Sequence, residues 1–324
     1  GYTGQDGLIG GSDVSYYKRY NFRVNSEHKM WNGLVTVGEH VGFVWKDTRG
    51  MGTGNIWNNN LRSAFSASPI IPVYDADGNY NSTVNSDWNV NDGNPYGNMM
   101  VNRYNNSKNG SLDANVYVQI EPIKNLRFKT VYGISYGASE YRAYTPKYQF
   151  TPQTANTVSK VNQSHGHGLS MVWTNTLSYD FNIATEHHVN ALIGSELSTY
   201  DGSNTEGSNT GLIPGFDDWD HAYLVNTNGT ENKTVKGSPY DSTRGMSYFA
   251  RLGWTWKERY MVNATMRADG SSKFAKGNRW GYFPSVSAGW TISEEKFMES
   301  VKSWFDFLKI RVSWGQVGLS LIHI

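Results

Sequence analysis

Apolar and polar residues alternate along three consecutive segments between Ser247 and Trp290. In an extended strand, residues two apart share a face, so this alternation gives one apolar and one polar face. The polar positions include Arg251, Asn263 and Arg267. The apolar positions are Tyr248, Ala250, Leu252, Trp254 and Trp256, then Tyr260, Val262, Ala264, Met266 and Ala268, and then Val286, Ala288, Trp290 and Ile292. Such a pattern, with aromatic residues at the strand ends, is typical of a transmembrane β-barrel wall.

The same periodicity predicts about ten strands along the chain. They span residues 15–25, 34–46, 111–121, 125–139, 166–181, 187–200, 244–256, 259–270, 281–292 and 307–316. The connections alternate in length. Residues 26–33, 122–124, 182–186 and 257–258 are short, whereas 47–110, 140–165 and 201–243 are long and rich in Asn, Gly, Ser and Pro. Because outer-membrane barrels have short turns on one rim and long loops on the other, we predict an all-β, partial antiparallel transmembrane barrel.

The aromatic content supports this fold class. The chain has 324 residues, and 14% of them are aromatic, whereas hydrophobic residues total only 38%. A soluble domain with this many aromatic residues would carry more aliphatic core around them. A membrane barrel does not need that core, because its lumen is polar and its outer apolar band is bordered by aromatic girdles.

Charge and cysteine content exclude several classes of protein and site. The formal net charge of +1 gives no basic surface for nucleic acid. The absence of cysteine excludes a disulfide scaffold and cysteine-based metal sites. No apolar run approaches the roughly 18 residues of a transmembrane helix, so any membrane crossing has to be made by strands.

The two ends of the chain predict a piece of a longer protein. The N-terminal sequence GYTGQDGLIGGSDVSYY lacks the charged and apolar regions of a signal peptide. We therefore expect either no export or a start within a longer polypeptide. Residues 319–324 (LSLIHI) break the alternation and resemble a translated sequencing adapter. We assign residues 1–318 to the partial barrel and 319–324 to a non-native tail.

Two local features depart from the simple pattern. Glu39 shares its face with Val37 and Val41, and a carboxylate facing lipid is costly, so we expect a β-bulge or a position near the membrane interface. Residues 293–304 start with Ser293 and two acidic residues, and they predict a short capped helix between two strands on the periplasmic side. Glu294 and Glu295 are expected to face water on that helix.

The segment RADGSSKFAKGNRWGYFPSVSAGWTISEEKFM (267–298) closely resembles the SusC/RagA family of TonB-linked outer-membrane proteins of Bacteroidetes-type bacteria. The preceding SYFARLGWTWKERYMVNATMRADGSSKF and the following WFDFLKIRVSWGQVG continue the similarity. So do PIIPVYDADGNY (69–80), NNSKNGSLDANVYVQIEPIKNLRFKT and YTPKY (144–148). The resemblance covers residues 1–318 and implies the middle-to-late part of a 22-stranded barrel.

The resemblance also implies a function. It implies active import of a large nutrient, a glycan or a peptide, with a SusD-like surface lipoprotein acting as a lid over the barrel. It further implies energy coupling by the TonB-ExbB-ExbD complex, which pulls on a plug that lies outside these residues. The implied location is the outer membrane, in contact with its lipid.

Aromatic residues in the long loops are the candidate ligand or partner contacts. Flat apolar rings with polar tips suit wet interfaces and can stack on sugar rings or contact a lid protein. Packing within the loops is the alternative explanation. The candidates are Trp57, Trp88, Tyr96, Trp219 and Tyr223. The aromatics at strand ends, such as Trp254, Trp256, Tyr260 and Trp290, are assigned instead to the membrane-interface girdle.

The remaining candidate motifs favour structural explanations. Asp75, Asp77 and Asn79 have the spacing that opens a calcium loop, but later ligand positions are missing, so a β-turn at Asp77-Gly78 is favoured. The cluster of Asp217, Asp218 and Asp220 is interpreted as a solvated loop, with binding of Ca²⁺ or sugar hydroxyls as the alternative.

Two further groups of residues give no functional site. The pairs His165/His167 and His187/His188 fall at opposite rims, so no metal site is predicted. No catalytic constellation and no cofactor motif is found, so we predict no enzymatic activity.

Three functional hypotheses follow from the sequence. The first is a TonB-dependent importer, the second is a passive porin or another outer-membrane barrel, and the third is a soluble β-rich glycan-binding module. Because ten strands leave two unpaired edges, we also expect an open curved sheet that does not fold stably alone.

Overall fold

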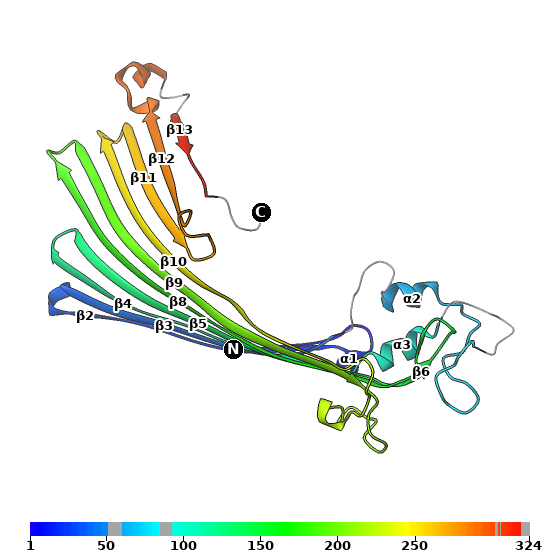
Figure 1. Ribbon diagram of the computed structural model, residues 1–324. Helices are drawn as coiled ribbons and strands as arrows, with labels where there is room; N and C mark the ends of the chain where they lie inside the picture. The colour runs from blue at the N-terminus through cyan, green and yellow to red at the C-terminus, as the bar shows by residue number, and fades with distance from the viewer. Residues whose placement is uncertain (51–59, 85–92, 302–303, 305, 319–324) are drawn as a thin grey trace.

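The computed structural model describes residues 1–50, 60–84, 93–301, 304 and 306–318. Eleven antiparallel strands form one curved sheet (Figure 1), and neighbours in the sheet follow one another along the chain. The strands are β1 (Tyr2–Asp6), β2 (Tyr16–Met30), β3 (Val35–Arg49), β4 (Asn105–Ile123), β5 (Leu126–Thr145), β8 (Lys160–Ile183), β9 (His187–Thr210), β10 (Thr234–Trp256), β11 (Tyr260–Ser271), β12 (Trp280–Thr291) and β13 (Lys309–Gly315). The sheet is open, with β1 and β13 as its edges. The predicted all-β barrel arc is confirmed, and β1 is an additional strand.

Shorter elements lie at the two rims of the sheet. The loop rim carries α1 (Gly11–Val14), α2 (Asn60–Ser66), α3 (Pro95–Val101), the hairpin of β6 (Tyr148–Gln149) and β7 (Ala155–Asn156), and the 3-10 turn η2 (Leu224–Asn226). The turn rim carries η1 (Trp31–Gly33), η3 (Ile292–Glu294) and η4 (Lys296–Val301). Among the described residues, no helix is both long and apolar enough to cross a membrane.

The strands extend much further toward the loop rim than the sequence predicts. The expected loops 140–165 and 201–243 are partly strand, because β5 continues to Thr145 and β9 to Thr210. β8 and β9 have 24 residues each, whereas a strand needs about 9–11 residues to cross a bilayer. The excess residues place the loop rim well above the membrane surface. Sequence periodicity misses these extensions because both faces of the sheet lie in water there.

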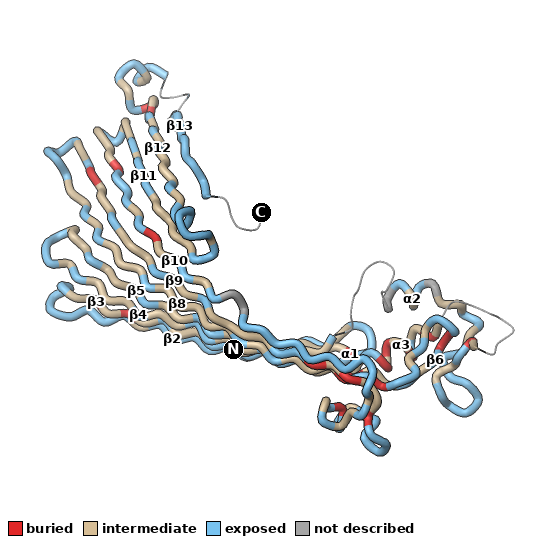
Figure 2. Tube along the Cα trace, in the orientation of Figure 1, coloured by how far each residue is buried: buried red, intermediate tan, exposed pale blue. Residues whose placement is uncertain are grey.

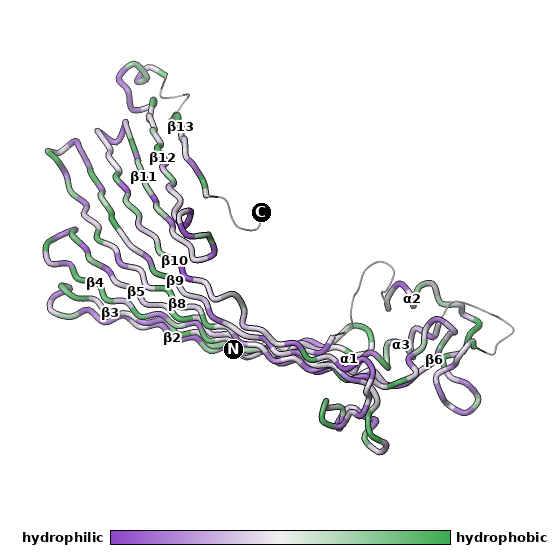
Figure 3. The backbone as a smooth tube through the Cα atoms, in the orientation of Figure 1, coloured by the Kyte–Doolittle hydropathy of each residue, from purple (hydrophilic) through white to green (hydrophobic). Residues whose placement is uncertain are grey.

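The register confirms the two faces predicted from the alternation. Leu252 lies opposite Ala264, which lies opposite Val286, and Trp254 aligns in the same way with Val262 and Ala288. Figure 3 shows apolar residues recurring along the neighbouring strands. Figure 2 shows that few residues of the sheet are buried. The ladder of backbone hydrogen bonds therefore holds the wall together. A small core cluster lies at the loop rim, where Tyr144, Val161, Leu212 and Ala222 pack together.

Glu39 lies on the apolar face without any bulge. The β2–β3 ladder is continuous from Met30↔Val35 to Tyr16↔Arg49, so the bulge proposed for this position is wrong. Ser26 lies directly opposite and donates a hydrogen bond from its hydroxyl to the Glu39 carboxylate, and Ser26 Oγ also contacts His28 Nε2 at 2.9 Å. The hydrogen bond from Ser26 compensates part of the cost of placing a carboxylate on this face.

The capped helix predicted for 293–304 is also wrong. Two 3-10 turns occupy this region, and Ser293 lies inside η3, where Thr291 is the N-cap residue without a side-chain cap. The backbone explains the difference. Ser293 N donates to Leu308 O (3.2 Å), and Glu295 has extended backbone angles, so the segment is interrupted between η3 and η4. The connection does lie at the turn rim, as expected (Figure 1).

Candidate ligand-binding site at the loop rim

The long connections enclose a pocket at the loop rim. Its volume is about 570 Å³. It lies among the turn at residues 74–80, α3, the end of β5, the β6–β7 hairpin and the 211–233 connection. Most of its lining is aromatic or polar. The lining residues are Tyr74, Gly78, Asn79, Tyr80, Met100, Val101, Tyr104, Tyr144, Pro146, Lys147, Tyr148, Gln149, Phe150, Asp217, Asp218 and Trp219. We call this pocket the outer-loop site.

A tight turn positions one wall of the outer-loop site. Asp75 Oδ1 accepts from the backbone N–H groups of Asp77 (3.0 Å) and Asn79 (2.8 Å), and Gly78 adopts a φ of 81°. This left-handed conformation favours glycine. The turn predicted at Asp77-Gly78 is therefore confirmed, and the Asp75 carboxylate is used within it. As a result Tyr74 and Tyr80 are bridge partners.

Five aromatic rings pack together at this wall, two of them beside the turn. Tyr74 and Tyr80 stack with ring centroids 5.6 Å apart, and Tyr96 of α3 packs edge-on against both. Tyr80 also meets the edge of Phe150, which stacks on Tyr148 at 4.9 Å. Tyr74 and Tyr96 remain 49% and 40% exposed, so parts of their rings are available to a ligand.

An arginine anchors the opposite wall. The Arg142 guanidinium lies 3.9 Å from the ring centroid of Trp219 and 4.2 Å from that of Tyr223, and its Nη1 donates to Trp219 O at 3.1 Å. Trp219 also stacks on Tyr104 at 6.2 Å. Cation–π contacts of this kind stabilise a loop against its strand. Arg142 therefore attaches the 211–233 connection to β5.

Tyr144 of β5 lines the pocket and also holds the 211–233 connection. Its side chain is buried, and its hydroxyl donates to Asp217 O (3.0 Å) and Asp217 Oδ1 (3.1 Å). Burial, followed by the nearby Asp217 charge, raises the pKa of Tyr144 well above its usual range. Tyr144 therefore stays neutral and acts as a hydrogen-bond donor at all physiological pH values.

The outer-loop site brings together three of the five candidate aromatic residues. Trp219 lines the pocket, Tyr96 packs against the lining residues Tyr74 and Tyr80, and Tyr223 lies beside the pocket on Arg142. Trp57 and Trp88 lie outside the described residues. Trp219 is covered by Arg142 and Tyr104, which favours a packing role, whereas Tyr96 and Tyr223 are each 40% exposed. Their contact with a ligand stays a prediction.

Sequence reasoning missed several residues of this site. Tyr74 and Tyr80 flank the recognised Asp-Gly turn, and that turn was the one available local signal for them. Arg142 and Tyr144 lie two residues apart on β5 and therefore share a face of the sheet. Nothing in the sequence indicates which distant loop they contact.

The acidic loop cluster is engaged in local contacts. Asp217 accepts from Tyr144 and lies 4.0 Å from Lys147 Nζ, and Asp218 accepts from the backbone and ring of His221. The hydrogen bond from the His221 ring holds the pKa of Asp218 below its usual value. In the described part of the chain no group of three or more His, Asp or Glu side chains could hold a metal ion.

The histidine pairs are separated along the ladder as predicted. His165 and His167 lie near the loop-rim end of β8, whereas His187 lies opposite Ile183 at the turn rim. They do not form a common site.

Three of the aromatic residues assigned to the girdle lie together at the turn rim. Trp256 stacks on Tyr260 at 5.3 Å, and Tyr260 stacks on Trp290 at 6.4 Å. Glu295 ties these rings together: it accepts from Tyr260 OH and from Trp290 Nε1 (3.1 Å), and it pairs with Arg259 (3.3 Å). The Glu295 side chain is only 14% exposed, so the expectation that it faces water is wrong.

Replacing Glu295 with alanine is expected to lower the thermal stability of the folded barrel by a few degrees. The change leaves the Trp290 and Tyr260 donors and the Arg259 charge without their shared acceptor. Heat-modified migration of the full-length protein on a mild detergent gel measures the effect. Glu299→Ala, which removes a carboxylate from the same connection, is the control and should leave the transition unchanged. Equal transitions for the two variants would contradict the role of Glu295.

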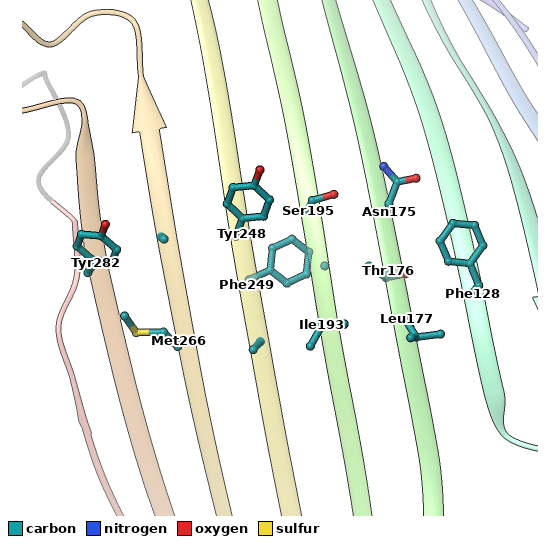
Figure 4. Close-up of a pocket in the computed structure, with 13 residues that line it drawn as sticks. Phe128, Asn175, Thr176, Leu177, Ile193, Ser195, Tyr248, Phe249, Met266 and Tyr282 are labelled. Carbon is teal, nitrogen blue, oxygen red and sulfur yellow. The ribbon is translucent and has the colours of Figure 1, made fainter. Parts of the chain in front are cut away.

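The apolar face carries a second pocket of about 590 Å³ across β5 and β8–β12. Figure 4 shows Phe128, Leu177, Ile193, Tyr248, Met266 and Tyr282 around it. Small residues such as Ala250 and Ala268 form its floor, between larger neighbours. Its position on the outward face identifies it as part of the lipid-contacting surface.

Comparisons with known proteins agree with this architecture. The chain is 27% identical over 331 residues to TonB-dependent receptor P26 of Formosa agariphila, a match that covers 98% of the chain and 30% of that protein. It is 51% identical over 73 residues to TonB-dependent receptor SusC of Bacteroides thetaiotaomicron, over 22% of the chain and 7% of SusC. The chain thus spans about 30% of the length of the curated relatives that it matches over most of its own length.

The fold is similar to that of solved transporters. A structure of the RagAB peptide transporter matches 97% of the chain and 34% of the solved chain, with a TM-score of 0.77 and 20% identity. No family model matches the chain. The comparisons confirm the resemblance to TonB-dependent receptors of the SusC/RagA type, and with it the barrel fold and the outer-membrane location.

Proposed function

We propose that this chain forms part of the wall and the outer mouth of a TonB-dependent importer for large nutrients, glycans or peptides. The outer-loop site carries the proposal, because it gathers exposed tyrosine faces and hydrogen-bonding groups at the rim that faces the cell exterior. Tyr74 in the lining and Tyr96 packed beside it offer stacking surfaces, while Lys147 and Asn79 offer polar contacts. A bound ligand would use both kinds of contact before passing into the barrel.

The proposal includes two partners. A SusD-like lipoprotein would cover the loop rim, where Tyr74, Tyr96 and Tyr223 are exposed, and the TonB-ExbB-ExbD complex would act through parts of the protein outside this chain. The support for both partners is the similarity to SusC and to the RagAB structures. The curated relatives are receptors and not enzymes, which agrees with a transport function.

Uptake of a fluorescent oligosaccharide or peptide by cells that express the full-length protein tests the proposal. Import should require the protein and should stop when tonB is deleted or a protonophore is added. Import that continues without TonB would instead identify a passive porin. Recovery of the protein from the soluble fraction would favour the glycan-binding module.

The contribution of the outer-loop site is tested separately. The double substitution Tyr74→Ala and Tyr96→Ala is expected to weaken ligand capture about tenfold, because each lost stacking contact removes about 0.5–1.5 kcal/mol. Binding of the labelled ligand to intact cells at 4 °C measures capture without transport. Tyr282→Ala removes an exposed aromatic ring from the lipid-facing surface and is the matched control. Equal capture by the two variants would place the ligand elsewhere.

A further inference from the structure

The polar face of β2 and β3 carries three cations, Arg19, Arg23 and Lys46. Arg19 and Arg23 lie on the face opposite Phe22, and Lys46 lies directly across from Arg19 in the ladder. Like charges in directly opposed positions destabilise a sheet. Among the described residues, none of the three cations forms a salt bridge or side-chain hydrogen bond. In addition, Arg19 Nε is buried without a hydrogen-bond partner.

Arg19 and Arg23 line a basin of about 520 Å³ in the barrel wall, and Lys46 lies across the ladder from Arg19, next to that lining. Its floor is open because Gly42 and Gly133 have no side chains, and a Cβ atom at either position would approach no atom closer than 3.8 Å. Asn21, Asn25 and Asn115 add amide groups around it. The basin therefore carries guanidinium and amide donors beside apolar residues such as Phe22, and it has room for a group larger than water.

The carboxylate in the basin already has a partner. Asp113 Oδ1 accepts from Ser135 Oγ at 2.6 Å, and neither Arg19 nor Arg23 reaches it. The local charge stays positive, with two guanidinium groups and one ammonium group against one carboxylate. Guanidinium groups bind carboxylates and other oxyanions through paired N–H donors, and such bonds are stronger than neutral ones.

We propose that this basin, lined by Arg19, Arg23 and their amide neighbours and flanked by Lys46, binds an oxyanion, a carboxylate or sulfate group, on the lumen wall. The lumen position rests on the proposed importer function. The anion has two possible sources: an acidic oligomer that passes through the barrel, or an acidic side chain from another part of the full-length protein. In both cases the anion satisfies the buried Arg19 Nε and relieves the repulsion between Arg19 and Lys46.

Calorimetric titration of the detergent-solubilised full-length protein tests the site. The probes are trigalacturonate and the neutral maltotriose, each at low and high salt. Wild type should bind the acidic probe at least tenfold more tightly than the neutral one at low salt, and salt should reduce this preference. The double variant Arg19→Gln/Arg23→Gln should lose it. Lys18→Gln removes a cation from the opposite face of the same strand and should keep it.

A second measurement distinguishes the two sources. If the anion belongs to the protein itself, wild type shows no preference for the acidic probe, and the double variant becomes at least tenfold more sensitive to proteinase K without ligand, whereas Lys18→Gln does not. Wild-type behaviour of the double variant in both measurements would overturn the site. Arg23→Gln alone, at an exposed position, replaces the double variant if that one fails to fold. TonB-dependent import of neutral cargo is unaffected by any of these results, so failure here leaves the proposed function untouched.

Discussion

Replacing Ile193 with lysine is expected to destabilise the membrane-inserted protein by about 2–4 kcal/mol. Ile193 is 58% exposed on the outward face, and its cross-strand neighbours are Leu177 and Ala250. Along the strand direction, Ile193 lies between Trp254, which is nearer the turn rim, and Tyr248, which is nearer the loop rim. A lysine there would place an ammonium group near the middle of the bilayer, where the cost of a charge is greatest.

Urea-dependent unfolding of the full-length protein in lipid vesicles measures this loss. Asn190→Lys is the matched control, because Asn190 lies on the same strand but on the lumen face, across from Asp180. The control is expected to change stability by less than about 1 kcal/mol, since a surface charge near an opposite charge contributes little. If both variants lost the same stability, the assignment of the two faces would be wrong.

The barrel wall was predictable because one physical constraint acts on every membrane-crossing residue. Lipid on one side and water on the other impose a period of two, whatever the distant contacts of the chain. Leu252, Ala264 and Val286 were therefore placed on one face from sequence alone, and the ladder aligns them as neighbours. Glu39 is informative because the ladder is regular at this position, where a carboxylate interrupts the apolar face, and Ser26 hydrogen-bonds the carboxylate there.

The constraint no longer acts where the strands leave the membrane, and prediction fails there. β9 runs on to Thr210 without an apolar face, so its composition resembles that of a loop. The segment after Thr291 carries local helix signals. Its backbone is instead held by a hydrogen bond from Ser293 N to Leu308 O, and local sequence does not reveal a contact between residues so far apart. Glu295 was misassigned for the same reason, because its partners Arg259 and Tyr260 belong to a different hairpin.

The outer-loop site could be predicted only in part. Sequence indicated that loop aromatics such as Tyr96, Trp219 and Tyr223 were candidates, since exposed rings suit wet interfaces. It did not indicate that Trp219 would be covered by Arg142, because the two residues are separated by a hairpin and two long strands. Which rings stay free for a ligand depends on these long-range contacts.

Arg142→Ala is expected to loosen the 211–233 connection by about 1–3 kcal/mol, because it removes cation–π contacts with two rings and a hydrogen bond to Trp219 O. A loss of this size raises the population of the open connection roughly five- to 150-fold. Cleavage of this connection by proteinase K should become faster by a similar factor. Mass spectrometry of the fragments identifies the cleavage site and measures the rate.

Lys147→Ala is the control for Arg142→Ala. It also removes a cation from the outer-loop site, but its contact with Asp217 is long, at 4.0 Å, and its side chain is 59% exposed. An exposed ion pair of this kind contributes at most about 1 kcal/mol, so cleavage should change little. If Arg142→Ala were no more sensitive than Lys147→Ala, the arginine would not hold the connection in place. The 211–233 connection would then not form a fixed wall of the outer-loop site. The ligand would in that case contact mainly Tyr74 and Tyr96 on the opposite wall.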